Sequence, residues 1–110
     1  MKITELAAKC GFETIVPAAE DHDVSAAYAS DLLSDVMANC PGDSVLVTVQ
    51  NHKNTVAVCT LTGAVAIVIC HGREVPADMS EAASAEKVAI FRSGMGQFEV
   101  SIAVAKALGL

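Results

Sequence analysis

The chain has 110 residues, of which 53% are hydrophobic and 18% charged, and its formal net charge is −6. This length is typical of one domain with its own core, so residues 1–110 are expected to form a single domain. The acidic balance, without any cluster of Lys or Arg, argues against nucleic acid and membrane surfaces as partners. One tyrosine and three phenylalanines are too few to stack single-stranded bases.

The cysteines indicate the expected compartment. Cys10, Cys40, Cys59 and Cys70 have spacings that fit no zinc site or iron–sulfur site, and each lies in or beside an apolar run. We therefore expect free thiols, no metal and no cofactor. The polar residues that follow Met1 do not resemble a signal peptide, and the sequence predicts a cytoplasmic protein.

The first half of the chain is predicted to alternate helices and strands. Thr4 is expected to cap a helix that Gly11 ends. Two strands follow, over Phe12–Val16 and Val24–Ala29. The turn Pro41-Gly42-Asp43 then ends a helix whose apolar residues recur at helical spacing. That apolar stripe consists of Leu32, Leu33, Val36, Met37 and Cys40.

The second half contains two nearly continuous apolar strands, Val45–Val49 and Ala64–Cys70, which are typical of parallel strands covered on both faces. We therefore predict a three-layer α/β/α sandwich whose mainly parallel sheet has about five strands, with these two at its centre. The remaining expected elements are a helix from Val56 to Leu61 closed by Gly63, a helix to about Lys87 opened by an Asp78/Glu81 capping box, a strand over Val88–Phe91, and a helix from about Gln97 to Leu108.

Polar residues follow the ends of four predicted strands. In open α/β sheets, ligands bind at the carboxyl edge, so these residues are candidate ligand contacts if the protein has a small-molecule site. The candidates are Ser30, Asp31, Asp35, His52, Asn54, Gly72, Arg73, Ser93 and Gly94.

Two functions remain open at this point. Asp31 and Asp35 are four residues apart, so a helix would place them on one face, where they could share a divalent cation and form a small metal-dependent enzyme with His52. Equally, two acidic residues in a first turn simply complement the helix dipole. The chain has no P-loop, G-x-S-x-G or H-E-x-x-H motif. The lack of a matched nucleophile and base favours a non-catalytic module that binds a small metabolite, a nucleotide or a partner protein.

The residues also resemble a known family. The segments that carry the resemblance are Ala27 to Ala38, Pro41-Gly42-Asp43, His52-Lys53-Asn54, Gly72-Arg73 and Phe98-Glu99. They resemble the small stand-alone DRTGG-domain proteins, which are similar to the N-terminal domain of HPr kinase/phosphorylase, although the literal Asp-Arg-Thr-Gly-Gly string is absent. The resemblance implies a dimeric regulatory or ligand-sensing module. It does not imply kinase activity, which belongs to a separate P-loop domain.

The last helix predicts self-association. Its apolar residues spread around the cylinder, whereas a helix on one face of a sheet needs a single apolar stripe. They are Phe98, Val100, Ile102, Val104, Ala105 and Leu108. We therefore expect a homodimer through this helix, which replacement of Val100 or Val104 by Glu would disrupt. The alternative is that the helix packs between the sheet and the first helix and leaves no patch.

Overall fold

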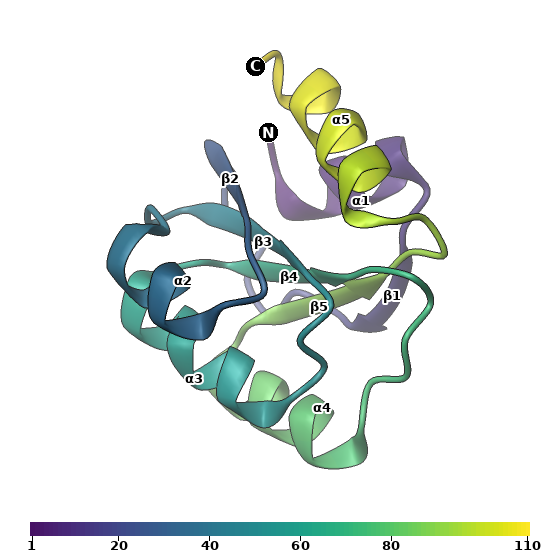
Figure 1. Cartoon of the computed structure of the whole chain (residues 1–110). Helices are drawn as coiled ribbons and strands as arrows, with labels where there is room; N and C mark the ends of the chain where they lie inside the picture. The colour runs from purple at the N-terminus through teal and green to yellow at the C-terminus, as the bar shows by residue number, and fades with distance from the viewer.

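The computed structural model describes all 110 residues as a five-stranded sheet between two layers of helices (Figure 1). The strand order is β1-β5-β4-β3-β2, in which only β1 is antiparallel to its neighbour. The predicted three-layer, mainly parallel α/β/α fold is confirmed. The strands are β1 Glu13–Val16, β2 Ala26–Ala29, β3 Ser44–Thr48, β4 Ala66–Ile69 and β5 Ala89–Arg92.

The helices form two layers, one on each face of the sheet. Helices α1 and α5 pack together on one face, while α2, α3 and α4 pack side by side on the other (Figure 1). Their bounds are α1 Ile3–Cys10, α2 Leu33–Asn39, α3 Lys53–Thr62, α4 Ala77–Glu86 and α5 Gln97–Leu108. None of these helices combines the length and the apolar character needed to cross a membrane.

The central strands are buried on both faces, as their uniform apolar sequences predict. Every residue of β3 and β4 is buried. Successive side chains alternate between the two cores: Val45 and Val47 pack in the core beneath α1 and α5, and Leu46 packs in the core beneath α2, α3 and α4. Strands of this kind place their carboxyl ends, and the loops that follow, at one edge of the molecule.

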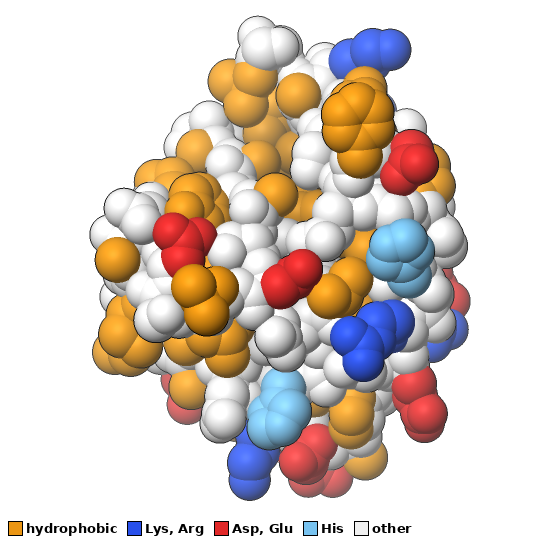
Figure 2. All heavy atoms as spheres, viewed as in Figure 1, with side chains coloured by type: hydrophobic (Ala, Val, Ile, Leu, Met, Phe, Trp, Pro, Cys, Tyr) orange, Lys and Arg blue, Asp and Glu red, His pale blue; other side chains and the backbone are white.

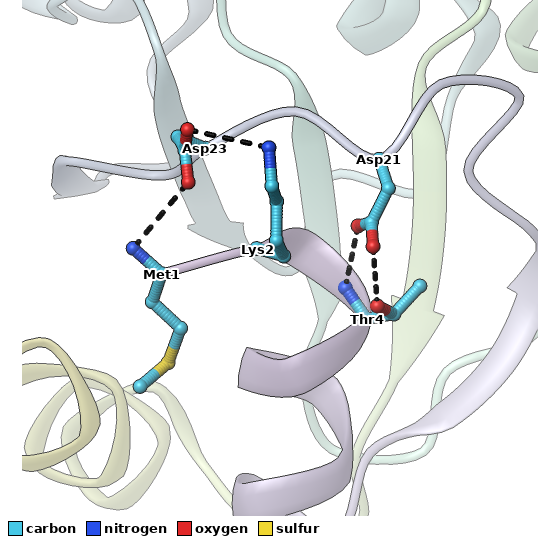
Figure 3. Close-up of polar contacts among 5 residues, drawn as sticks. All are labelled: Met1, Lys2, Thr4, Asp21 and Asp23. Carbon is cyan, nitrogen blue, oxygen red and sulfur yellow. Dashed lines mark hydrogen bonds and ion pairs between the residues drawn. The ribbon is translucent and has the colours of Figure 1, made fainter.

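The predicted helix caps are wrong at α1 and α4. Helix α1 begins at Ile3, so Thr4 lies inside its first turn, and the N-cap residue is Lys2, whose side chain makes no capping hydrogen bond. Instead, the Thr4 amide and hydroxyl donate hydrogen bonds of 3.0 Å and 2.7 Å to the carboxylate of Asp21 in a distant loop (Figure 3). Helix α4 follows Pro76 without any side-chain cap, so Asp78 and Glu81 form no capping box.

The amphipathic stripe predicted around α2 is only partly correct. Val36 is fully buried, but Leu32 is 64% exposed and Met37 is 53% exposed. Leu32 lies before the helix, which starts at Leu33 and has only two turns packed against α3. Of the other residues of the predicted stripe, Cys40 is buried and Leu33 is partly buried, so only part of the stripe faces the core.

Helix α5 buries the residues that the sequence placed at a dimer interface. Val100 and Val104 are fully buried in the core beneath α5, because their side of the helix faces the sheet. Phe98 and Ile102, on the opposite side, are 76% and 40% exposed. The expectation that Val100 and Val104 lie at a dimer interface is therefore wrong. The alternative, in which α5 packs between the sheet and α1 and leaves no patch, is correct only in part. Helix α1 does pack against α5, but an exposed apolar stripe remains on α5.

Candidate functional site at the carboxyl edge

The loops that follow four parallel strands are hydrogen-bonded into one surface. His71 N and Gly72 N donate to the carbonyl oxygens of Met95 and Ser93 at 2.8 Å and 2.7 Å, which joins the loops after β4 and β5. The Arg73 guanidinium donates to the carbonyl of Val49 at 2.7 Å and so joins the loop after β4 to the end of β3. The structure thus brings the segments after β3, β4 and β5 together, as the sequence predicts for this edge.

Asp31 connects the loop after β2 to this surface. Its Oδ1 atom accepts hydrogen bonds from Thr48 Oγ1 (3.0 Å), Val49 N (2.8 Å) and Gln97 Nε2 (3.0 Å). Its backbone carbonyl accepts a further 2.8 Å bond from the Gln50 side chain. Asp31 therefore holds the end of β3 and the first turn of α5 in place, which is the work of a positioning residue.

Asp35 has a different set of partners. Tyr28 Oη donates to Asp35 Oδ2 at 2.8 Å, and Asn39 Nδ2 donates to Oδ1 at 2.9 Å. The hydrogen bond from Tyr28, followed by those from Ser30 and Asn39, holds the pKa of Asp35 below its ordinary value. The same contact raises the pKa of the Tyr28 phenol. Asp35 thus anchors α2 to β2.

The arrangement does not support a metal-dependent enzyme. Asp31 precedes α2, which begins at Leu33, so Asp31 and Asp35 do not share a helical face, and their carboxylates bind separate partners. His52 is exposed in another loop. No group of three or more His, Cys, Asp and Glu side chains is placed to hold a metal ion. The alternative of a metal site formed by Asp31, Asp35 and His52 has no geometric support, because Asp31 lies before α2 and not in its first turn.

The other polar candidates divide between the edge and the next helix. Ser30 Oγ and Ser93 Oγ accept bonds from Leu32 N and Met95 N, so both hydroxyls stabilise their own turns. His52 lies at the start of α3. Asn54, however, lines an open groove of about 480 Å³ between α3 and α4, to which none of the other candidates contributes.

Two candidate glycines lie where the loops after β4 and β5 meet. A side chain at Gly72 would lie 3.9 Å from Gly94 Cα, and Gly72 also has a φ of +60°, which favours glycine. Gly94 has open space around it. The backbone is therefore accessible at this point of the edge.

The candidate residues from the sequence include neither His71 nor Gln97. A Cβ atom at Gly96 would lie 2.8 Å from Glu99 Oε2 and 3.0 Å from His71 Cε1, so His71 and Glu99 converge over Gly96 at the start of α5. The polar residue after β4 was the available signal for His71. Gln97 reaches Asp31 across 66 positions, and no local pattern could reveal this contact.

The electrostatics of the edge do not favour nucleophilic catalysis by a thiol. Cys70, at the end of β4, is buried; burial first, and the nearby Asp31 charge second, raise its pKa to about 11. The face in Figure 2 carries scattered charges of both signs among uncharged and hydrophobic atoms, without a continuous basic patch. The edge is therefore a mixed polar surface built from backbone groups, hydroxyls, imidazoles, one guanidinium and the carboxylates of Asp31 and Glu99.

Comparison with known proteins places the fold. No family model matches this sequence, and no curated protein matches it. Among the solved structures that match is that of the CBS and DRTGG domains of the regulatory region of Clostridium perfringens pyrophosphatase, in complex with its activator diadenosine tetraphosphate, with a TM-score of 0.75 over 96% of this chain. The two share one fold. The sequence identity is 7%, and the match covers 46% of that structure, so this chain corresponds to about half of its length.

Proposed function

We propose that residues 1–110 form a non-catalytic regulatory module of the DRTGG type, similar to the N-terminal domain of HPr kinase/phosphorylase, that binds a small ligand. One observation carries the proposal: almost the whole chain shares its fold with part of a regulatory region crystallised with a nucleotide activator. The family resemblance of the sequence supports the same conclusion independently of the fold. We expect this function in the cytoplasm, where the four thiols stay reduced.

The proposed binding site is the carboxyl edge, formed by Ser30, His52, Gly72, Arg73, Ser93 and Gly94 together with His71. The Arg73 guanidinium uses one nitrogen to hold Val49 O, and its remaining N–H groups are available to a phosphate. Asp31 would position the surrounding loops rather than contact the ligand. Asp35 and Asn54 are not part of the proposed site, because their side chains face Tyr28 and the groove between α3 and α4.

The ligand that this chemistry favours is a phosphate-bearing nucleotide. Exposed imidazole and guanidinium groups suit the phosphates, and the backbone at Gly94 is open to close approach. The neighbour's activator is itself a nucleotide. A ligand of this kind would stabilise the native state and shift its population without any chemical step.

We also propose that the module works as a homodimer through α5. Phe98 and Ile102 form an exposed apolar stripe on the side of the helix that faces away from the sheet. A second copy of the chain would cover this stripe.

The test is a thermal-unfolding series with diadenosine tetraphosphate, ATP and orthophosphate, each with and without Mg²⁺. A nucleotide at a hundred times its Kd should add about 2.7 kcal/mol to the free energy of unfolding. Arg73→Ala should abolish the effect, whereas Lys9→Ala, an exposed cation on α1, should leave it unchanged. Amide chemical shifts should change in the loops after β4 and β5. Binding by none of the three compounds, or changes confined to the opposite edge of the sheet, would refute the proposal.

A further inference from the structure

The two outer strands of the sheet differ in how they are protected. On β1, the register with β5 is broken between Thr14 and Val16, Pro17 follows directly, and Glu13 pairs with Arg92 at 2.7 Å. A bulge, a proline and a charge are the features that keep an edge strand from pairing with another chain. The edge formed by β1 is therefore protected against pairing with another strand.

Strand β2 has none of these features. Its four residues, Ala26, Ala27, Tyr28 and Ala29, include no charge and no proline, and they pair with β3 in an unbroken parallel register. β2 is the last strand of the sheet, so half of its backbone N–H and C=O groups point away from β3 with no strand to receive them. The alanine side chains leave this backbone open to close approach. The edge is therefore suited to an additional strand.

Exposed apolar side chains lie on both sides of β2. Five of the seven exposed large hydrophobic residues lie in α2 or α5, just before α2, or just after α5: Leu32, Met37, Phe98, Ile102 and Leu110. The hydrophobic side chains in Figure 2 gather over β2, α2 and α5. A groove of about 220 Å³ separates β2 from α5 and is lined in part by Tyr28, Ser101, Ala105 and Leu110. An occupant of this edge would thus meet backbone groups with an apolar surface on each side.

We propose that β2 pairs antiparallel with β2 of a second copy of this chain, across a two-fold axis, so that two five-stranded sheets become one continuous sheet. The inference rests on the proposed homodimer and specifies its geometry. Antiparallel pairing follows because a two-fold axis perpendicular to the sheet reverses the strand direction. It would place α5 beside α5 of the partner, with the small residues Ser101 and Ala105 on the facing sides, and α2 beside α2.

Symmetry favours a second copy as the occupant, and the strand that it would meet carries no charge. Two chains that each carry a net charge of −6 repel one another and approach best through an uncharged strip, and β2 is uncharged. The acidic residue bonded to this strand, Asp35, is engaged by Tyr28 and Asn39. A foreign strand would satisfy the backbone groups of β2 alone. A second copy brings its own α2 and α5, so Ser101 and Ala105, which line the groove beside β2, meet the same residues of the partner.

The experiment combines light scattering with amide hydrogen exchange on the full chain. Amides of β2 should gain at least tenfold protection as protein concentration rises through the dimerisation range, while exposed amides of β1 should not. Ala29→Lys places a charge on the β2 edge and should weaken dimerisation at least tenfold. Thr14→Lys, the matched change on the β1 edge, should leave dimerisation unchanged. Circular dichroism and thermal unfolding would establish that both variants fold.

The outcomes separate this inference from the proposed function. A dimer that tolerates Ala29→Lys and whose β2 amides exchange freely would overturn strand pairing but retain a dimer formed through α5 alone. A monomer at all concentrations would overturn the second copy as occupant and leave the edge to a foreign strand. Nucleotide binding, measured on the same samples, tests the proposed ligand site separately in both cases.

Discussion

Gln97 and Asp31 lie 66 positions apart, and the Gln97 side-chain amide donates a 3.0 Å hydrogen bond to the Asp31 carboxylate. The same oxygen atom accepts bonds from the hydroxyl of Thr48 and the amide of Val49. One carboxylate thus connects the loop after β2, the end of β3 and the start of α5. The geometry of the proposed ligand site depends on this connection.

Replacement of Asp31 should therefore destabilise the protein. Asp31→Ala removes the acceptor of three hydrogen bonds and leaves their donors partly buried, which should cost about 2–3 kcal/mol of unfolding free energy. Urea unfolding at pH 7 measures the difference. Glu81→Ala, an exposed acid on α4, is the control and should change stability by less than about 0.5 kcal/mol. Equal stability of the two variants would contradict the role of Asp31.

The pair of Tyr28 and Asp35 predicts a pH dependence of stability. The folded-state pKa of Asp35 is lowered by the Tyr28 hydrogen bond. Its contribution to stability is therefore present above the pKa of the unfolded chain, near 3.9, and is lost as pH falls through the lower folded value. Tyr28→Phe should reduce stability at pH 7 and have a smaller effect at pH 2.5. Urea midpoints at both values test this, and an equal loss at both would contradict it.

The phenol of Tyr28 provides a direct spectroscopic test of the same contact. It is the only tyrosine and the chain has no tryptophan, so phenolate absorbance reports this residue alone. Its hydrogen bond to Asp35 raises its pKa, and the absorbance midpoint should lie above the ordinary value near 10. Asp35→Asn should lower this midpoint. A midpoint that is unchanged by the substitution would show that the two side chains do not meet.

The four thiols should differ in reactivity. Cys40, Cys59 and Cys70 are buried, and burial raises the pKa of Cys59 to about 12. Cys10 is partly exposed, although burial also raises its pKa. A pulse of iodoacetamide at pH 8, followed by mass spectrometry, should modify Cys10 first, and Cys10→Ser should eliminate the early product. Modification of Cys70 at the rate of Cys10 would contradict its placement in the core.

Substitutions in α5 should separate folding from association. Val100→Ala leaves a cavity in the core beneath α5 and should cost about 2 kcal/mol of unfolding free energy. Phe98→Ala, at the exposed position, should change the stability of the isolated protomer by less than about 0.5 kcal/mol. Urea unfolding at low protein concentration measures the first effect, and light scattering measures the loss of dimer that we expect for Phe98→Ala. Equal losses of unfolding free energy for the two substitutions would contradict the burial of Val100 and the exposure of Phe98.

Local patterns in the sequence predicted most of the fold. The continuous apolar runs around Leu46 and Ile67 indicated doubly covered strands, because any polar face would require alternation. Gly11 and Gly63 indicated helix ends, and both adopt the left-handed conformation that glycine tolerates best. Polar residues after successive strands indicated one edge of the sheet. These signals depend on residues that are close together in the sequence, so the sequence alone is enough to reveal them.

Only the tertiary structure decided which partners the polar groups would find. The first turn of α1 is hydrogen-bonded by Asp21, Gln97 reaches Asp31, and Tyr28 donates a hydrogen bond to Asp35. It also decided that Val100 faces the sheet and Phe98 faces solvent, because periodicity shows that a helix is apolar without showing which side is covered. Secondary structure follows from local sterics and hydrophobic period. Long-range pairs follow from how the layers pack, and packing is a property of the whole chain.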